Sequence, residues 1–410
     1  MQPADAPPTP DRGAPIPTRE FIAMIASLMA MAALGIDTML PALPEIGEAL
    51  HVENPNHRQF VIAVFGAGFG VAQIIHGPLA DRFGRRRLLL CALIAYAATN
   101  VLAAVAASFP LLLAARFLGG TMVAATRVAT VAMVRDCYSG RAMARTMSLA
   151  FMVFMAVPVV APALGQAILL FGDWRTIFWV IGATALMVAG WIALRLPETL
   201  HEEDRRPIQI GVIFDGWRAT LRDRLSLGYT IAAAALTGAL YGYLGSIEQI
   251  MSDTFGRPEL LIVIFATTAG TMMAANLVNS RLVMRLGMRR LGHGAVAMLS
   301  MLAALHLGLV LAVHETLWTF AVVQALTLAC FALSTSNFSA LAMERMGHIA
   351  GTASSVQGFV ALTIGSTCGA LIGTAFDGTT APLTAAFLAA GLTALIAAAV
   401  TERGRLFRPA

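Results

Sequence analysis

Twelve long apolar stretches recur along the chain and constrain its fold more than any other feature. A helix needs roughly 20 mostly apolar residues to cross the hydrocarbon core of a membrane. Of the 410 residues, 58% are hydrophobic and 12% are charged, and an aqueous fold could not bury so much apolar surface. We therefore predict an all-α membrane protein whose twelve transmembrane helices cover about 20–42, 57–79, 88–107, 109–134, 145–170, 175–196, 226–250, 258–282, 291–313, 316–340, 351–374 and 380–400.

The 28 basic residues are all arginines, and they are distributed unevenly between the two sides of the membrane. With the N-terminus inside, 23 fall on the cytoplasmic side, whereas Arg58, Arg175 and Arg257 fall outside. Arg116 and Arg127 lie within a span. This bias predicts a multi-pass inner-membrane protein with both termini in the cytoplasm. Because membrane topology and contact with membrane lipids explain the excess of basic residues, we expect no nucleic-acid partner.

An internal repeat divides the chain near its midpoint. Gly84 corresponds to Gly287, an offset of 203, and four neighbouring residues recur at the same offset. Two parallel six-helix pseudo-repeats of this kind place a small-molecule site between them, near the midplane. The predicted units are a disordered cytoplasmic tail (1–18), a six-helix bundle (19–196), a cytoplasmic linker with an amphipathic helix (197–225), a second six-helix bundle (226–400) and a C-terminal cytoplasmic tail (401–410).

The loop after the second span carries the most specific motif. It reads Gly-Pro-Leu-Ala-Asp-Arg-Phe-Gly-Arg-Arg-Arg over 77–87, and it resembles the signature of the major facilitator superfamily. The resemblance covers nearly the whole chain and implies a proton-coupled antiporter of drug-like molecules that works by alternating access. Segments that resemble the Bcr/CflA branch, named for bicyclomycin and chloramphenicol resistance, are 37–44, 135–136, 174–178, 197–200 and 348–355.

The signature loop also suggests a cytoplasmic latch. The span at 351–374 begins on the same side as Asp81, and the positive N-terminal end of that helix can receive the Asp81 carboxylate across the two halves. The resemblance implies the same contact. Positive-inside topology alone would explain the arginines of the loop but not the aspartate. The predicted latch consists of Gly77, Asp81, Arg82, Gly84, Arg85 and Arg86.

A second motif lies in the fifth span. Pro158 and Pro162 are followed by Gly165, and the prolines free backbone carbonyls and let a helix bend, which suits alternating access. The segment resembles the antiporter motif of the family, although Gln166 stands where the family has a second glycine. The alternative is that these prolines are of the kind common in membrane helices and have no special role.

Asp37 and Arg116 are the predicted proton-coupling residues. Ionisable groups inside the bilayer are costly, so each is a functional candidate. Asp37 lies near the outer end of the first span, where it either meets water or forms a buried proton site, and the resemblance favours the proton site. Arg116 lies within side-chain reach of it and is its predicted partner. The family pattern around this arginine has a glutamine where Gly119 stands here.

Other polar residues of the spans are candidates for a substrate cavity. Arg127 lies on the same helix face as Arg116, about 16 Å deeper, and either attracts anionic groups of the substrate or snorkels to the interface. Glu248 faces either the cavity or the outer mouth. The remaining candidates, which can equally serve helix packing, are Asn276, Gln324 and Asn337.

The motifs of other classes are absent from the sequence. It contains no HExxH, GxSxG, CxxC or phosphate-binding glycine loop, so we expect neither an enzyme nor a catalytic residue, metal site or cofactor other than the coupling proton. We predict a monomeric exporter of drug-like small molecules. The alternative is a proton-coupled exporter of a sugar, amino acid or dipeptide.

Overall fold

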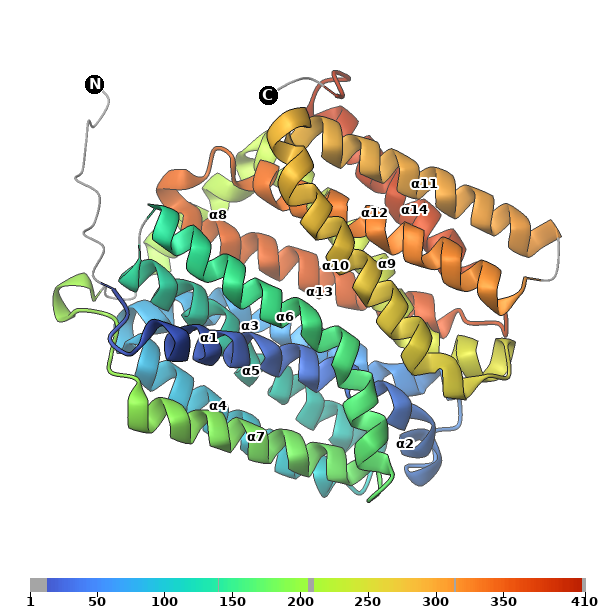
Figure 1. The fold of residues 1–410 in the computed structure, drawn as a ribbon, viewed down its shortest axis with the longest axis horizontal. Helices are drawn as coiled ribbons and strands as arrows, with labels where there is room; N and C mark the ends of the chain where they lie inside the picture. Colours follow the sequence, from blue (N-terminus) through green and yellow to red (C-terminus); the bar gives the residue numbers. More distant parts are fainter. Residues whose placement is uncertain (1–12, 139, 206–209, 313–314, 408–410) are drawn as a thin grey trace.

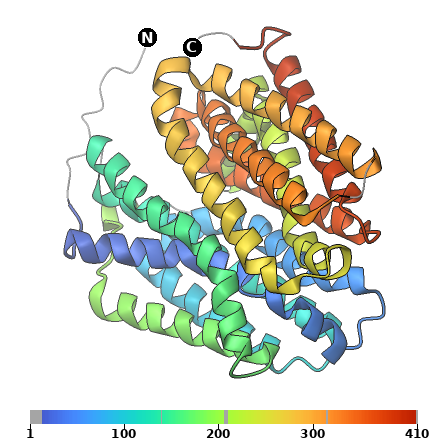
Figure 2. The ribbon, with the colours of Figure 1, turned by 45° about the vertical axis from the view of Figure 1, so that its right-hand side comes forward.

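The computed structural model describes residues 13–138, 140–205, 210–312 and 315–407, and over these ranges every regular element is helical. The chain forms two helical bundles that lie side by side (Figures 1 and 2). The long helices of the first bundle are α1 (Thr18–Asp37), α3 (Phe60–Phe83), α4 (Arg85–Ala104), α5 (Phe109–Cys137), α6 (Gly140–Leu169) and α7 (Trp174–Arg195). Short helices between α1 and α3 are η1 (Leu40–Ala42), α2 (Leu43–Ala49) and η2 (Pro55–Gln59).

The second bundle follows a linker that contains the short helix α8 (Ile210–Arg222). Its first helix, α9, continues into a π-helical turn, η4 (Ile250–Thr254). The long helices are α9 (Arg224–Gln249), α10 (Leu261–Leu286), α11 (Met288–Ala312), α12 (Leu317–Met343), α13 (Ala350–Thr374) and α14 (Ala381–Thr401).

Each predicted span overlaps one long helix. Within the described ranges, eleven helices are long and apolar enough to cross a membrane. The predicted span 145–170 lies in α6, of which Ala156–Leu169 forms a shorter apolar helix. An all-helical, multi-pass membrane protein is thereby confirmed, while the number twelve and the repeat stay predictions. Residues 1–12 of the predicted tail, 206–209 of the linker and 408–410 of the C-terminal tail lie outside the described ranges.

The turns α3/α4 and α10/α11 both depend on a glycine. Gly84 has φ 93° and Gly287 has φ 80°, a backbone conformation that side chains with a Cβ rarely adopt. Each glycine therefore lets the chain reverse within one residue between two long helices. We refer to the end of the molecule that carries these two turns as the basic end, because Arg85, Arg86, Arg289 and Arg290 follow them directly.

Ion pairs hold helix ends together at the basic end. Arg85 is 2% exposed, and its Nε donates to Asp136 at the end of α5 at 2.9 Å. In the second bundle, Arg289 pairs with Glu344 at 2.9 Å and with Glu402 at 2.8 Å, residues that follow α12 and α14. Each bundle thus has an arginine after its glycine turn that binds acidic groups at the ends of other helices.

The two bundles contact each other unevenly. Helices α3 and α13 pack together over most of their length, from Gly70 against Thr363 to Gly77, where a Cβ atom would lie 3.6 Å from Ser355 Oγ. Helices α6 and α10 cross near the end opposite the basic end and diverge toward the basic end (Figures 1 and 2). The buried residues of α10 accordingly lie between Leu261 and Ala275, and none lies in 276–286.

Candidate functional site

Asp37 lies where the first helix ends and the two bundles approach each other. It is the last residue of α1, and its side chain is 5% exposed. The backbone carbonyl of the next residue, Thr38, packs directly against Gly165 of α6. Among the described residues, no hydrogen bond or ion pair reaches the Asp37 carboxyl group. An uncompensated buried carboxylate is costly, so Asp37 stays a candidate functional residue.

Arg116 is bound inside the first bundle. Its Nη2 donates to the carbonyl of Gly35 at 2.8 Å and its Nε donates to the carbonyl of Val61 at 3.0 Å. The guanidinium carbon lies 4.2 Å from the ring centroid of Phe65 and 5.8 Å from that of Phe178. These contacts join α5 to α1 and α3 and satisfy the cation in a low-dielectric site.

The predicted Asp37–Arg116 ion pair is therefore wrong for this conformation. The described hydrogen bonds of Arg116 go to backbone carbonyls, those of Gly35 and Val61. Gly119, which replaces the glutamine of the family pattern, faces Thr99 and Tyr96: a Cβ atom there would lie 3.3 Å from Thr99 Oγ1 and 3.5 Å from Tyr96 Cε2. Arg116 contacts α1 through the carbonyl of Gly35, and its role in proton coupling stays a prediction.

Arg127 differs from Arg116 in being exposed. It lies three helical turns further toward the basic end on the same face of α5, the face that Arg116 directs toward α1 and α3. Its charge acts on the hydroxyl group of Tyr241 in α9, on which Asp37 also acts. The two predicted roles of Arg127, attracting anionic groups of the substrate and snorkelling to the interface, both stay predictions. Within the described ranges its guanidinium has no hydrogen-bond or ion-pair partner.

Tyr241 and Tyr243 were missing from the sequence prediction. Tyr241 crosses the junction of the bundles: a Cβ atom at Gly66 of α3 would lie 3.0 Å from the Tyr241 hydroxyl oxygen. Tyr243 shares a hydrogen bond of 3.0 Å with Thr268 of α10, and it too lies within range of the charge of Asp37. The sequence signal that could have identified them is a pair of tyrosines two residues apart in an otherwise apolar span.

The predicted cavity amides have mostly structural partners. Asn276 of α10 accepts a hydrogen bond from Ser336 of α12 at 2.7 Å. Asn337 donates to Asn279 at 2.8 Å. Gln324 is buried in α12, and its Nε2 has no hydrogen-bond partner among the described groups. Two of the three predicted amides thus connect α10 to α12.

The predicted latch residues contact their own bundle. Asp81 pairs with Arg85, one helical turn later, at 2.8 Å. Arg82 lies over the ring of Phe83 at 5.7 Å, and Arg86 donates to the carbonyl of Ala193 at 2.7 Å. The expected contact of Asp81 with the N-terminal end of α13 is not formed in this conformation, because the nearby Arg85 guanidinium binds the carboxylate instead. Gly77 faces α13, where a Cβ atom would lie 3.6 Å from Ser355 Oγ.

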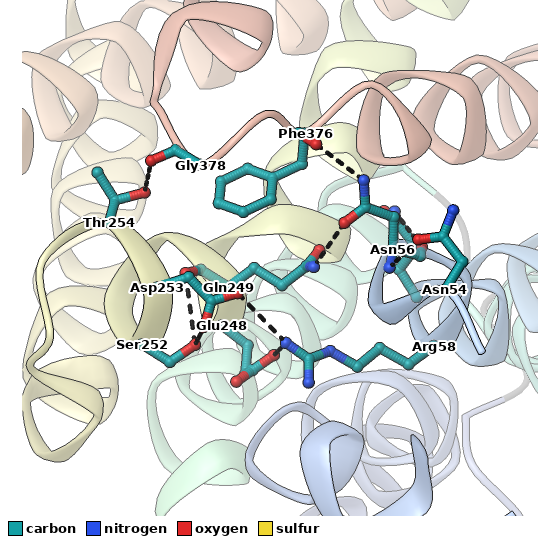
Figure 3. Close-up of polar contacts among 11 residues, drawn as sticks. Asn54, Asn56, Arg58, Glu248, Gln249, Ser252, Asp253, Thr254, Phe376 and Gly378 are labelled. Atoms are coloured by element: carbon teal, nitrogen blue, oxygen red, sulfur yellow. Dashed lines mark hydrogen bonds and ion pairs between the residues drawn. The ribbon is translucent and has the colours of Figure 1, made fainter. Parts of the chain in front are cut away.

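The proline motif and Glu248 lie at other parts of the junction. Helix α6 continues through Pro158 and Pro162, so the prolines are accommodated within it. Gly165 of the same motif contacts Thr38, which connects it to the surroundings of Asp37. Glu248 lies at the end opposite the basic end, where its Oε2 is 3.4 Å from Arg58 Nη2 (Figure 3). Glu248 thus lies at a contact between the two bundles, and the prediction that this end is the outer mouth stays a prediction.

Comparisons with known proteins agree with this architecture. Residues 25–366 match the family model described as Major Facilitator Superfamily. A bicyclomycin resistance protein homolog from Haemophilus influenzae is 30% identical over 364 residues, 88% of this chain and 91% of the relative. A chloramphenicol resistance protein from Pseudomonas aeruginosa is 30% identical over 290 residues, 67% of each chain.

A solved structure supports the fold independently of sequence. The human organic anion transporter MFSD10 (TETRAN) has a TM-score of 0.69 and covers 94% of this chain and 99% of its own, at 17% identity. This likeness concerns the fold alone. The family match and the drug-resistance names of the relatives indicate a membrane transporter rather than an enzyme. The chain therefore belongs to the Major Facilitator Superfamily, in its Bcr/CflA-like branch.

Proposed function

We propose that the chain exports small drug-like molecules from the cytoplasm in exchange for protons, by alternating access in the inner membrane. The observation that carries the proposal is the buried Asp37 carboxyl group, which has no counter-charge among the described residues. A proton neutralises such a group, so Asp37 can alternate between two charge states. The names of the relatives support drug-like cargo, and the distribution of arginines supports a cytoplasmic basic end.

The described conformation fits the inward-facing state of this cycle. Helices α6 and α10 diverge toward the basic end (Figure 1), and no residue of 276–286 in α10 is buried. In the proposed cycle, cargo enters at this end from the cytoplasm. Release of the proton from Asp37 toward the cytoplasm restores its charge. Each net charge that then crosses the membrane contributes about 2.3 kcal/mol per 100 mV of potential. Cargo and the proton thereby compete for binding at the same junction between the two bundles.

Replacing Arg127 with alanine is expected to weaken transport of acidic cargo selectively. Its guanidinium is exposed at the junction without a counter-charge in the described ranges, so it is available to an anionic group of the cargo. A charge-assisted contact is worth about 1.5–3 kcal/mol, which corresponds to about a 10- to 100-fold higher half-saturating concentration. The measurement is uptake of anionic, neutral and cationic candidates into inverted vesicles.

The matched control is Arg257→Ala, at an arginine that is 62% exposed at the opposite end of the molecule. This variant should transport all three classes of cargo as the parent does. An equal loss for all classes in Arg127→Ala would contradict a role in recognising charge.

Proton-gradient-driven uptake in the same vesicles tests the proposed function itself. We expect accumulation of drug-like compounds that disappears when the gradient is dissipated. Accumulation of a sugar, amino acid or dipeptide instead, with no drug in the panel transported, would replace the drug-export proposal with the metabolite alternative.

A further inference from the structure

A polar network closes the end of the molecule opposite the basic end. Its centre is Asn56 of η2, which belongs to the first bundle (Figure 3). The Asn56 Nδ2 donates to the carbonyls of Phe376 at 2.8 Å and Thr374 at 3.2 Å, in the chain that leaves α13. Its Oδ1 accepts from Gln249 Nε2 of α9 at 2.8 Å. One asparagine thus joins η2 to two elements of the second bundle.

Charged groups of the same segments extend the network. Arg58 of η2 lies between two carboxylates of the second bundle, with its Nη2 3.4 Å from Glu248 Oε2 and 3.8 Å from Asp253 Oδ2. We call Asn56, Arg58, Glu248, Gln249 and Asp253 the clasp. Every one of these contacts crosses between the bundles, so the clasp must break before this end can open.

The charges of the clasp do not balance. One guanidinium faces two carboxylates, which leaves one negative charge in excess at neutral pH. Asp253 is 48% exposed, and water and the Ser252 hydroxyl, 2.8 Å away, solvate it. Glu248 is 5% exposed, and its Oε2 accepts no hydrogen bond among the described groups. The excess charge is therefore most costly on Glu248.

Within the described ranges, Arg58 and Asp253 are the charged side chains that act on Glu248. The titratable neighbour of Arg58 in η2 is His57, which is exposed and stacks on the ring of Phe60. The helices η1, α13 and α14 contain no charged residue, and the charged residues of α3 lie at the basic end. Glu248 also lies seven residues after Tyr241, two turns along the same face of α9, about 10 Å away. The face of α9 that meets Gly66 of α3 through Tyr241 thus ends at the clasp.

We propose that Glu248 is a second proton-binding residue, and that its protonation releases the clasp and opens this end of the transporter. A neutral Glu248 no longer attracts Arg58 across the junction. The remaining ion pair between Arg58 and the half-exposed Asp253 is solvated, and such pairs contribute little to the stability of the closed form. Opening then gives external water access to Asp37. The inference rests on the proposed alternating access and adds a site at which external pH acts on the conformation.

The test is a distance measurement across the opposite end. Spin labels replace Glu53, in the first bundle, and Glu259, in the second, both of which are exposed, in a cysteine-free background in lipid nanodiscs. Distances are recorded between pH 5 and pH 8. In the parent we expect the longer distance to gain population as the pH falls.

Four variants decide the interpretation. In Glu248→Gln we expect the ratio of open to closed forms at neutral pH to rise roughly fivefold or more, and its pH dependence to disappear. Asp253→Asn should keep a pH response but shift it to lower pH, because it removes the excess negative charge and leaves Glu248 paired with Arg58. Asn56→Ala should open the clasp while keeping the pH dependence, because it removes hydrogen bonds and leaves the charges. A pH response in Glu248→Gln equal to that of the parent would overturn the proposal.

The fourth variant, Asp37→Asn, separates this inference from the proposed function. We expect it to retain the pH response of the clasp although it cannot couple transport to protons. Loss of the response in Asp37→Asn and its survival in Glu248→Gln would assign the pH sensor to Asp37. Conversely, proton-coupled efflux by Asp37→Asn would contradict the proposed function and leave the clasp intact.

Discussion

Replacing Asp37 with asparagine is expected to abolish proton-driven efflux while leaving a folded protein in the membrane. Asparagine has nearly the same shape as aspartate but cannot exchange a proton, and no described hydrogen bond or ion pair of Asp37 is lost. For one proton exchanged per cargo, each pH unit of gradient supports about a tenfold accumulation. A gradient of about two units should therefore support roughly 100-fold accumulation in the parent and none in the variant.

Two measurements keep this result interpretable. Exchange of labelled for unlabelled cargo without a gradient should persist in Asp37→Asn, because that step needs no net proton movement. Glu48→Gln is the control, since it removes an exposed carboxylate of α2 at the same end of the molecule. Gradient-driven accumulation by Asp37→Asn at the parental level would refute the role assigned to Asp37.

Replacing Gly120 with alanine is expected to destabilise the first bundle by about 3 kcal/mol, at the upper end for overpacking. A methyl group there would overlap the backbone carbonyl of Phe65 in α3 and lie 2.9 Å from the nitrogen of Phe69. Gly68 of α3 packs in the same way against the carbonyl of Phe117 in α5. Because both obstacles are backbone atoms, the helices must separate to admit the methyl group.

Thermal unfolding of the detergent-solubilised protein measures this effect as a fall in Tm of several degrees. Gly190→Ala in α7 is the matched control, because a Cβ atom there would meet nothing within 4 Å. Its Tm should stay the same or rise, since alanine favours helix by about 1 kcal/mol over glycine. Equal Tm values for Gly120→Ala and the parent would show that α3 and α5 are further apart than described.

Several features of the site were predictable because they depend on local sequence. The length of a span follows from the thickness of the bilayer, so hydropathy located each long helix. Gly84 and Gly287 marked turns that only glycine accommodates easily. The signature motif around Asp81 identified the family, which the comparisons confirm. Asp37 stood out because a carboxyl group inside an apolar span is rare.

The partners of the charged residues were not predictable in the same way. Arg116 was expected to bind Asp37, but it donates to the carbonyls of Gly35 and Val61. Asp81 was expected to reach α13, but it binds Arg85. Backbone carbonyls are identical in every sequence, so no pattern of side chains reveals which of them a buried arginine will find.

The sequence by itself determined the class of fold, the position of the long helices and the family, because each of these depends on residues close together in the chain. The tertiary structure alone decided that Glu248 meets Arg58, 190 residues earlier, and that Tyr241 packs against Gly66. Such contacts depend on how helices rotate and tilt against one another. That arrangement is set by the packing of small residues such as Gly66 and Gly120 across the whole interface, and it has no local signature.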